Sequence, residues 1–194
     1  MRKGQLRRHT KETRISTSVA IDGHGKASVD TGIGFFDHML ELFARHGLFD
    51  LSVKCKGDLH VDDHHSVEDV AIALAGAFKE ALGKKAGISR FGCAYVPMDE
   101  SLARCVVDLS GRSSLVFNAA FKRAKVGNLS TEMVHHFFRS FAGALKANIH
   151  IEVLYGVNTH HKIEAIFKSF ALAMREACAT DRRITGIPST KGRL

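Results

Sequence analysis

The chain has 194 residues, of which 45% are hydrophobic and 25% are charged. These are ordinary values for a globular protein and exclude the disordered and fibrous classes. The length suits one large domain or two small fused halves. The net charge of +8 favours anionic partners such as phosphorylated metabolites or nucleic acid.

The sequence contains no segment of the membrane-spanning type. Its longest apolar run, residues 70–78, is far shorter than the ~20 residues that cross a bilayer. The N-terminus lacks the apolar segment of a secretory signal, and the four cysteines are widely spaced with no CxxC pair. We therefore expect a cytoplasmic protein with reduced thiols that does not bind membranes.

The first half of the chain predicts five elements in the order β-β-α-β-α. Alternating apolar residues indicate the strands, and apolar residues three and four apart indicate the helices. A turn at 22–25 predicts that the first two strands form a hairpin. The predicted elements are strands at 15–21 and 27–30, a helix at 35–45, a strand at 49–55 and a helix at 63–82.

The second half predicts the same order of elements. Two strands are expected to pair around a turn at 110–112, followed by a helix, a strand and a last helix. These elements are strands at 102–109 and 114–121, a helix at 131–147, a strand at 149–153 and a helix that carries residues 163–174.

Residue identities support an internal duplication. Segments 63–81 and 159–177 align without gaps at an offset of 96 residues. Two helices that match by chance would share only apolar positions, whereas this pair shares polar residues as well. The preceding helices correspond too, since His38 aligns with His136. The matched polar pairs are His64 with His160, His65 with His161, Glu68 with Glu164, and Glu80 with Glu176.

The repeated His-His-x-x-Glu motif predicts a metal centre. Neighbouring helical residues point ~100° apart, so adjacent histidines diverge and are expected to reach different ions. The glutamate lies one turn later and can share a face with either histidine. A single His-His pair would be read as a surface or capping feature, but duplication favours ligands. The candidate ligands are three histidines and one glutamate for each of two ions, namely His38, His64, His65, Glu68, His136, His160, His161 and Glu164.

Imidazole and carboxylate ligands without thiolates suit Mn, Fe, Co, Ni or Zn.

Lys168 lies on the metal-facing side of its helix, whereas its repeat counterpart is Ile72. This difference indicates a substrate contact on one side only, with an ordinary solvated lysine as the alternative. His46, two turns after His38, can line the same site.

Basic and hydroxyl groups elsewhere suit a phosphate. Arg90 and Arg112 lie in short turns beside strands, where a guanidinium can bind a phosphate through two hydrogen bonds. The C-terminal segment 188–194 offers hydroxyls, a lysine and backbone amides, although a frayed basic tail would look similar.

Seven segments are distinctive in combination: GIGFFDHML (32–40), DDHHSVEDVAIAL (62–74), SRFG (89–92), PMDE (97–100), STEMVHHFFRSFA (130–142), HHKIEAIFKSF (160–170) and PSTKG (188–192). Together they resemble the imidazoleglycerol-phosphate dehydratase family from about Arg8 to Leu194. The resemblance is to the monofunctional form, because no phosphatase domain precedes the matching region.

The resemblance implies an α+β fold of the ribosomal protein S5 domain 2 type, with helices packed against mixed sheets. Residues 1–194 would form one domain of two repeats, at about 8–84 and 91–180, with a substrate-binding tail at 186–194. It also implies a homo-oligomer of twenty-four subunits that needs metal to assemble, with active sites between subunits. Each site would hold two Mn²⁺ ions on the eight candidate ligands.

The implied reaction is the dehydration of D-erythro-imidazole glycerol phosphate to imidazole acetol phosphate in histidine biosynthesis. It would pass through an imidazolate and a diazafulvene, which acidifies the neighbouring C–H bond. We expect Glu12 to be the acid/base group, with Glu164 or a ligand histidine such as His38 as rivals. The implied substrate contacts are Glu12, His46, Arg90, Arg112, Lys168, Ser189, Thr190 and Lys191.

Two other functions compete with this one. A dinuclear metallohydrolase could use the same ligands to direct water at a phosphate ester. A basic nucleic-acid-binding protein could use the clusters as structural metal sites. The second is disfavoured because Lys and Arg are scattered, Trp is absent and no nucleic-acid-binding motif occurs. We therefore expect a small phosphorylated imidazole, and no nucleic acid, as the partner.

Overall fold

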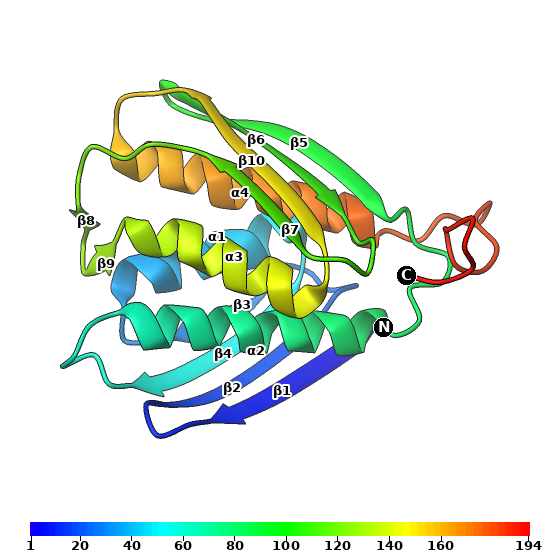
Figure 1. Cartoon of the computed structure of the whole chain (residues 1–194), viewed down its shortest axis with the longest axis horizontal. Coiled ribbons are helices and arrows are strands. Elements are labelled where there is room, and N and C mark those ends of the chain that lie inside the picture. Colours follow the sequence, from blue (N-terminus) through cyan, green and yellow to red (C-terminus); the bar gives the residue numbers. More distant parts are fainter.

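Four helices form a layer between two four-stranded β-sheets (Figure 1). The computed structural model describes residues 1–194. The prediction of an α+β fold with β-β-α-β-α repeats and mixed sheets is confirmed. No helix combines the length and the hydrophobicity that a membrane-spanning segment requires.

The first sheet has the strand order β1-β2-β4-β3, in which β3 runs parallel to β4 and the other neighbours are antiparallel. Alternate residues of β2 and β4 are buried against the helices, as their period of two requires. The elements of this half are β1 (Lys3–His9), β2 (Thr13–Ala20), β3 (Ala27–Asp30), α1 (Gly34–Gly47), β4 (Asp50–Gly57) and α2 (His64–Leu82).

The second sheet repeats this arrangement with the order β5-β6-β10-β7, in which β7 runs parallel to β10. A small two-stranded ribbon, β8 with β9, precedes the third helix. The elements are β5 (Phe91–Met98), β6 (Ser101–Asp108), β7 (Ser114–Asn118), β8 (Lys125–Val126), β9 (Leu129–Ser130), α3 (Glu132–Leu145), β10 (Asn148–Tyr155) and α4 (Thr159–Cys178).

The predicted pairing of neighbouring strands is wrong in both halves. β2 and β3 do not form a hairpin, because β4 lies between them, and β10 separates β6 from β7 in the same way. Each half also begins with an edge strand, β1 or β5, that the sequence analysis did not predict. Edge strands bury few side chains, so β1 shows a weak apolar pattern with Leu6 as its single large apolar residue.

Two glycines bring the edge strands close to the helices and show how similar the halves are. A Cβ atom on Gly4 would lie 2.0 Å from the Ala77 carbonyl oxygen, and one on Gly92 would lie 2.0 Å from the Ala173 carbonyl oxygen. Ala77 and Ala173 are repeat partners. Each edge strand therefore packs directly on the backbone of the second helix of its own half.

The helices pair across the repeats. α1 packs against α4, and α2 packs against α3, so each pair joins one helix of each half. Phenylalanine rings fill the space between them: Phe43 stacks on Phe170 with ring centroids 5.0 Å apart, and Phe78 meets Phe141 edge-on at 6.1 Å. The two halves therefore share one hydrophobic core.

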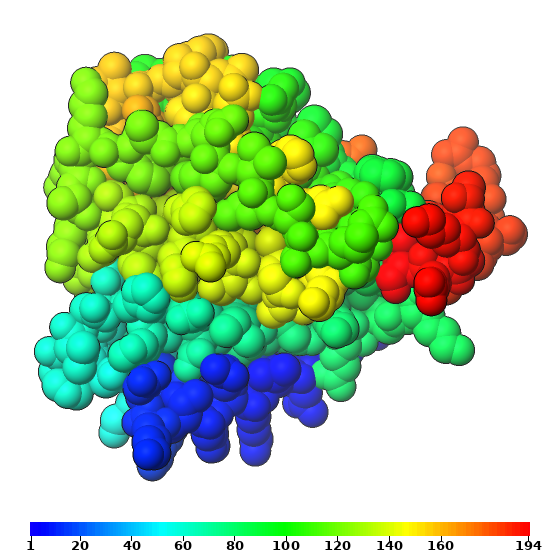
Figure 2. Space-filling view, in the orientation of Figure 1, coloured from blue at the N-terminus to red at the C-terminus, as the bar shows by residue number.

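The C-terminal segment lies at the end of the molecule where α4 finishes (Figure 1). Figure 2 shows it as a red lobe that projects from that end. It is attached by backbone hydrogen bonds to the loop before β5, including one of 2.7 Å from the Gly87 N–H to the Gly186 carbonyl.

Candidate metal centre

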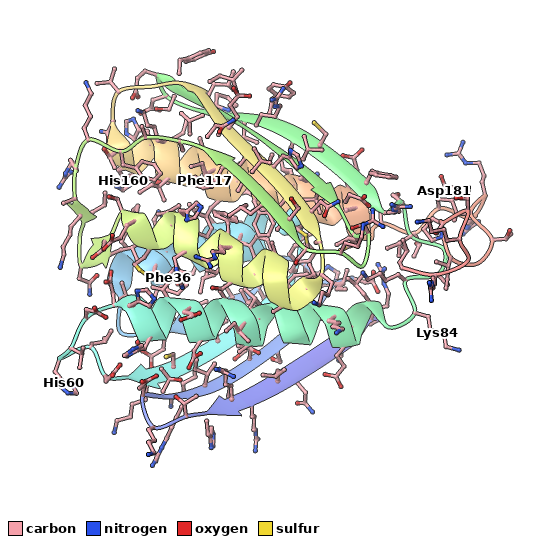
Figure 3. The ribbon with its side chains drawn as sticks, in the orientation of Figure 1. Phe36, His60, Lys84, Phe117, His160 and Asp181 are labelled. Carbon is pink, nitrogen blue, oxygen red and sulfur yellow. The ribbon has the colours of Figure 1, made fainter.

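Two groups of histidine and glutamate side chains lie where metal ions could bind. We call His64, Glu68 and His136 the α2–α3 cluster, and His38, His160 and Glu164 the α1–α4 cluster. The His-His-x-x-Glu motifs occupy the first turns of α2 and α4, so both clusters lie at the start of these long helices. Figure 3 labels His160 at that end of the helical layer.

In the α1–α4 cluster, two imidazoles face one carboxylate oxygen. The Nε2 atoms of His160 and His38 lie 2.8 and 3.4 Å from Glu164 Oε1. The ammonium of Lys168 lies 2.7 Å from the other oxygen. Burial alone would raise the pKa of Glu164, but the hydrogen bonds from Lys168 and His160 outweigh burial and lower the pKa to about 2. Glu164 is therefore held as a carboxylate.

The α2–α3 cluster has the same donors in a looser arrangement. The Nε2 atoms of His64 and His136 lie 3.8 and 3.5 Å from the two oxygens of Glu68, and the two rings are 4.3 Å apart. The Nε2 atom of His136 is buried and has no hydrogen-bond partner. Buried polar atoms without a partner are rare, and a metal ion would satisfy this one. The donor set of nitrogen and oxygen therefore fits a divalent transition metal.

Each cluster takes its ligands from both repeats. His38 belongs to the first repeat but meets Glu164 of the second, and His136 of the second repeat meets Glu68 of the first. This exchange follows from the pairing of α1 with α4 and of α2 with α3. Neither half of the chain could build a cluster alone.

The other histidine of each pair points away from the clusters, as the ~100° divergence requires. His65 Nδ1 lies 3.0 Å from Asp58 Oδ2, and His161 Nδ1 lies 2.7 Å from Glu100 Oε2. These hydrogen bonds raise the pKa of both histidines. One chain therefore brings together six of the eight predicted ligands, three in each cluster.

Asp58 and Glu100 were missed by the sequence analysis. A carboxylate that holds one ring nitrogen of a histidine orients the other nitrogen for a metal ion. The signal for Glu100 is the repeat itself, because the offset that aligns Gly4 with Gly92 also aligns Glu12 with Glu100. Glu12 lies in the corresponding turn of the first half, with Oε1 3.8 Å from His65 Nε2.

His46 and Lys168 lie beside the α1–α4 cluster. Lys168 pairs with Glu164, and it also contacts the sulfur of Met98 at 3.1 Å. Burial lowers the pKa of His46, and the charge of Lys168 lowers it further. The imidazole of His46 is therefore uncharged at neutral pH.

The predicted phosphate contacts lie at the opposite end of the molecule. The backbone N–H of Arg90 bonds to the carbonyl of Ala177, near the last turn of α4. This places Arg90 about 25 Å along the helix from His160, at 1.5 Å per residue. Arg112 and the tail with Ser189, Thr190 and Lys191 lie at this far end too, since Leu194 contacts Gly111. Figure 3 shows the separation by its labels for His160 and Asp181. A single copy of the chain therefore does not bring the predicted phosphate contacts and the His/Glu clusters together.

Comparison with known proteins identifies the family. The protein-family model for imidazoleglycerol-phosphate dehydratase matches residues 31–174. The chain belongs to this family. An imidazoleglycerol-phosphate dehydratase of Chlorobium luteolum is 60% identical over 193 residues, covering 100% of this chain and 96% of that protein. The protein of the same name from Acetivibrio thermocellus is 55% identical, with 100% and 99% covered.

Solved structures of the family have the same fold as this chain. A crystal structure of imidazoleglycerol-phosphate dehydratase from Staphylococcus aureus superposes with a TM-score of 0.83 at 39% identity, covering 92% of this chain and 99% of that chain. The enzyme from Pyrococcus furiosus gives a TM-score of 0.81 at 34% identity, covering 97% and 100%. The chain is thus a hydro-lyase of the imidazoleglycerol-phosphate dehydratase family, which acts in histidine biosynthesis.

Proposed function

We propose that this enzyme converts D-erythro-imidazole glycerol phosphate to imidazole acetol phosphate and water with two Mn²⁺ ions per active site. The observation that carries the proposal is the pair of cross-repeat clusters, each with three nitrogen and oxygen donors and one with a buried, unpartnered imidazole nitrogen. A divalent metal at these clusters supplies Lewis acidity toward the nitrogens of the substrate's imidazole ring.

We further propose that the active site forms between copies of the chain. Each cluster lacks a fourth protein ligand, while His65 and His161 direct one ring nitrogen away from both clusters. A neighbouring copy can complete a cluster with one of these histidines. The same association can bring Arg90, Arg112 and the tail of one copy to the clusters of another. The expected assembly is the homo-oligomer of twenty-four.

Glu12 is the proposed acid/base group. Its side chain is half-exposed, and its contact with His65 means that the two residues would enter a neighbouring site together. Glu164 is a poor rival, because a carboxylate with a pKa of about 2 binds protons weakly. His38 is also a weaker candidate, since its Nε2 faces Glu164 as a ligand would.

The proposed residue roles follow the chemistry of the substrate. Hydroxide leaves the carbon attached to the ring, which creates a diazafulvene and acidifies the adjacent C–H bond. Glu12 then removes this proton, and the resulting enol becomes the ketone. Arg90, Arg112, Ser189, Thr190 and Lys191 hold the phosphate, while Lys168 and His46 border the reacting end of the substrate.

The test is a dehydratase assay with Mn²⁺ and imidazoleglycerol phosphate, monitored by the appearance of an enolisable ketone. Replacing Glu12 by Gln should keep the metal content and lower turnover at least ~100-fold. Light scattering should show large particles. No ketone with Mn²⁺ present would refute the reaction, and a metal-loaded monomer with full activity would refute the shared site.

A further inference from the structure

Arg90 is held in one orientation by Asp108. Its Nε and Nη2 atoms donate to the two oxygens of Asp108 at 2.7 and 3.1 Å, and both side chains are more than four-fifths buried. The guanidinium also lies over the ring of Phe91, 4.7 Å from its centroid. A two-bond pair of this kind fixes the plane of the guanidinium as well as its position.

The backbone of Arg90 is fixed as well. Its φ angle of 69° is unusual for a residue with a side chain. Its N–H bonds to the Ala177 carbonyl, and its own carbonyl accepts from the N–H of Leu109. The loop before β5 thus locks Arg90 between the end of α4 and the end of β6.

The same guanidinium holds the C-terminal segment. Nη1 of Arg90 donates to the Pro188 carbonyl at 2.9 Å, directly before the hydroxyl pair Ser189 and Thr190. At its far end the segment contacts Gly111, where a Cβ atom would lie 2.3 Å from the Leu194 carbonyl carbon. Arg90 therefore connects the segment to the sheet, next to the turn that carries Arg112.

An arginine has five N–H donors, and these contacts occupy three of them. The two remaining donors belong to Nη1 and Nη2, and they can bind an anion. The carboxylate of Asp108 does not compete for these two donors. Its pairing orients the guanidinium and, through Pro188, the hydroxyls and amides of the segment.

We infer that Asp108 is a positioning residue for the phosphate group of the substrate, acting through Arg90 and the Pro188 carbonyl on the C-terminal segment. The inference rests on the proposed function, in which Arg90 and Ser189–Lys191 bind that phosphate. Because both oxygens of Asp108 are paired with Arg90, Asp108 acts through that guanidinium, and we expect its loss to weaken phosphate binding and to leave the chemical step unchanged.

The test is the variant Asp108→Asn in the metal-loaded enzyme. An amide cannot accept both hydrogen bonds, so the guanidinium loses its fixed plane. The expected result is a rise of about 10-fold in KM and in the inhibition constant of inorganic phosphate, with kcat within about twofold, as for loss of one charged hydrogen bond. Hydrogen exchange of the amides of residues 189–192 should also become faster.

Asp181→Asn is the matched control. Asp181 forms a similar two-bond pair with Arg183 in the same C-terminal region, but the Arg183 side chain is exposed and its hydrogen bonds go to Asp181 alone. This variant should leave KM, phosphate inhibition and amide exchange at residues 189–192 unchanged. If Asp108→Asn is insoluble, Asp108→Glu gives the same test, because glutamate keeps the charge but its longer side chain cannot hold the guanidinium in the same plane.

An unchanged KM and unchanged phosphate inhibition in Asp108→Asn would overturn the inference. So would a fall in kcat with KM unchanged, since that pattern indicates damage to the whole structure. If the unaltered enzyme showed no dehydratase activity, the proposed function would fail separately. Direct binding of inorganic phosphate and amide exchange in the two variants would still decide the role of Asp108.

Discussion

The two clusters contain the same ligand types but differ in their surroundings. The side chain of Glu164 is 7% exposed and is paired with Lys168. The side chain of Glu68 is 38% exposed, and the position that corresponds to Lys168 is occupied by Ile72, which cannot form an ion pair. Similarly, His46 beside the α1–α4 cluster corresponds to Ala144 in the other repeat. The duplication has kept the histidines and glutamates in both halves, whereas Lys168 and His46 beside the α1–α4 cluster have apolar counterparts in the other repeat.

We expect this difference to give the two clusters different tasks. Lys168 holds Glu164 as a carboxylate and adds a positive charge beside the cluster, which favours an anionic substrate on that side. The α2–α3 cluster has an imidazole nitrogen without a hydrogen-bond partner, and isoleucine replaces the lysine one turn after its glutamate. We expect the first cluster to be more specialised for substrate and the second mainly to hold metal.

The largest expected effect comes from removing one ligand of either cluster. His64→Ala and His160→Ala should each lose about half of the bound metal and lower turnover at least ~100-fold, because outer-shell changes alone cost 10–100-fold. Metal analysis and the dehydratase assay measure this. His135→Ala is the control, since His135 is exposed and packs edge-on against Phe117 rather than in a cluster. Full metal content in either ligand variant would contradict the assignment of these clusters.

The next largest effect concerns the close packing of Gly4 and Gly92 on the helices, a feature that the two halves share. Gly4→Ala and Gly92→Ala should each destabilise the fold by about 2 kcal/mol, because both new methyl groups would collide with a helix carbonyl. This corresponds to roughly 30-fold in the unfolding equilibrium, measurable by urea denaturation. Gly143→Ala is the control, since nothing lies within 4 Å of its Cβ position and alanine favours a helix. If the losses of unfolding free energy in Gly4→Ala and Gly92→Ala differed by more than about 2 kcal/mol, the repeats would not be equivalent at these positions.

A smaller effect concerns Lys168 and Ile72, a pair of corresponding positions at which the two halves differ. Lys168→Met removes the ion pair with Glu164 and should lower kcat/KM by about 10-fold, as expected for a hydrogen bond to a charged group. Ile72→Met is the matched change in the other repeat and should alter kcat/KM by less than about twofold. Equal effects of the two substitutions would mean that the clusters are not specialised as proposed.

The smallest effect concerns His46. Its pKa lies below the usual ~6.5 because of burial and the charge of Lys168. As the pH falls below ~6.5, the unfolded chain binds a proton at this position before the folded chain does, so acidification destabilises the protein. In Lys168→Met the pKa of His46 should rise because one of the charges that lower it is removed, and NMR titration of the ring would detect the change. A pKa that falls would refute the proximity of these two charges.

Much of the fold could be predicted from the sequence, because the main elements have strong local signals. The helices carry apolar residues at helical spacing. α1, α2 and α3 begin and end within about two residues of their predicted bounds, and α4 contains the predicted residues 163–174. Strand β1 was missed because Leu6 is its single large apolar residue, so its sequence shows no apolar alternation. Strand β5 was missed because its large side chains Phe91 and Tyr95 are exposed while the small Gly92 is buried, which hides the alternation. The pairing of β2 with β3 was predicted wrongly because alternation shows that a strand exists but not which strand lies beside it.

The two clusters of histidine and glutamate could also be predicted in part from the sequence, since six of the eight predicted ligand residues meet in them. Duplicated polar residues at fixed helical spacing separate a functional pattern from an apolar core pattern. The roles of Asp58 and Asp108 could not be predicted in this way, and the repeat marks Glu100 only as the counterpart of Glu12, without its partner His161. Each meets its partner from a different element, so no local spacing connects the two.

By itself, the sequence determined the repeat, the four helices and the donor atoms, since these depend on residues that are close along the chain. Only the tertiary structure decided that each cluster combines helices of both halves, and that the residues predicted to contact phosphate lie at the opposite end from the clusters. The physical reason is that helix pairing depends on how the phenylalanine-rich faces of α1 to α4 fill one shared core. The energy of that packing comes from contacts between distant residues, which a local pattern does not contain.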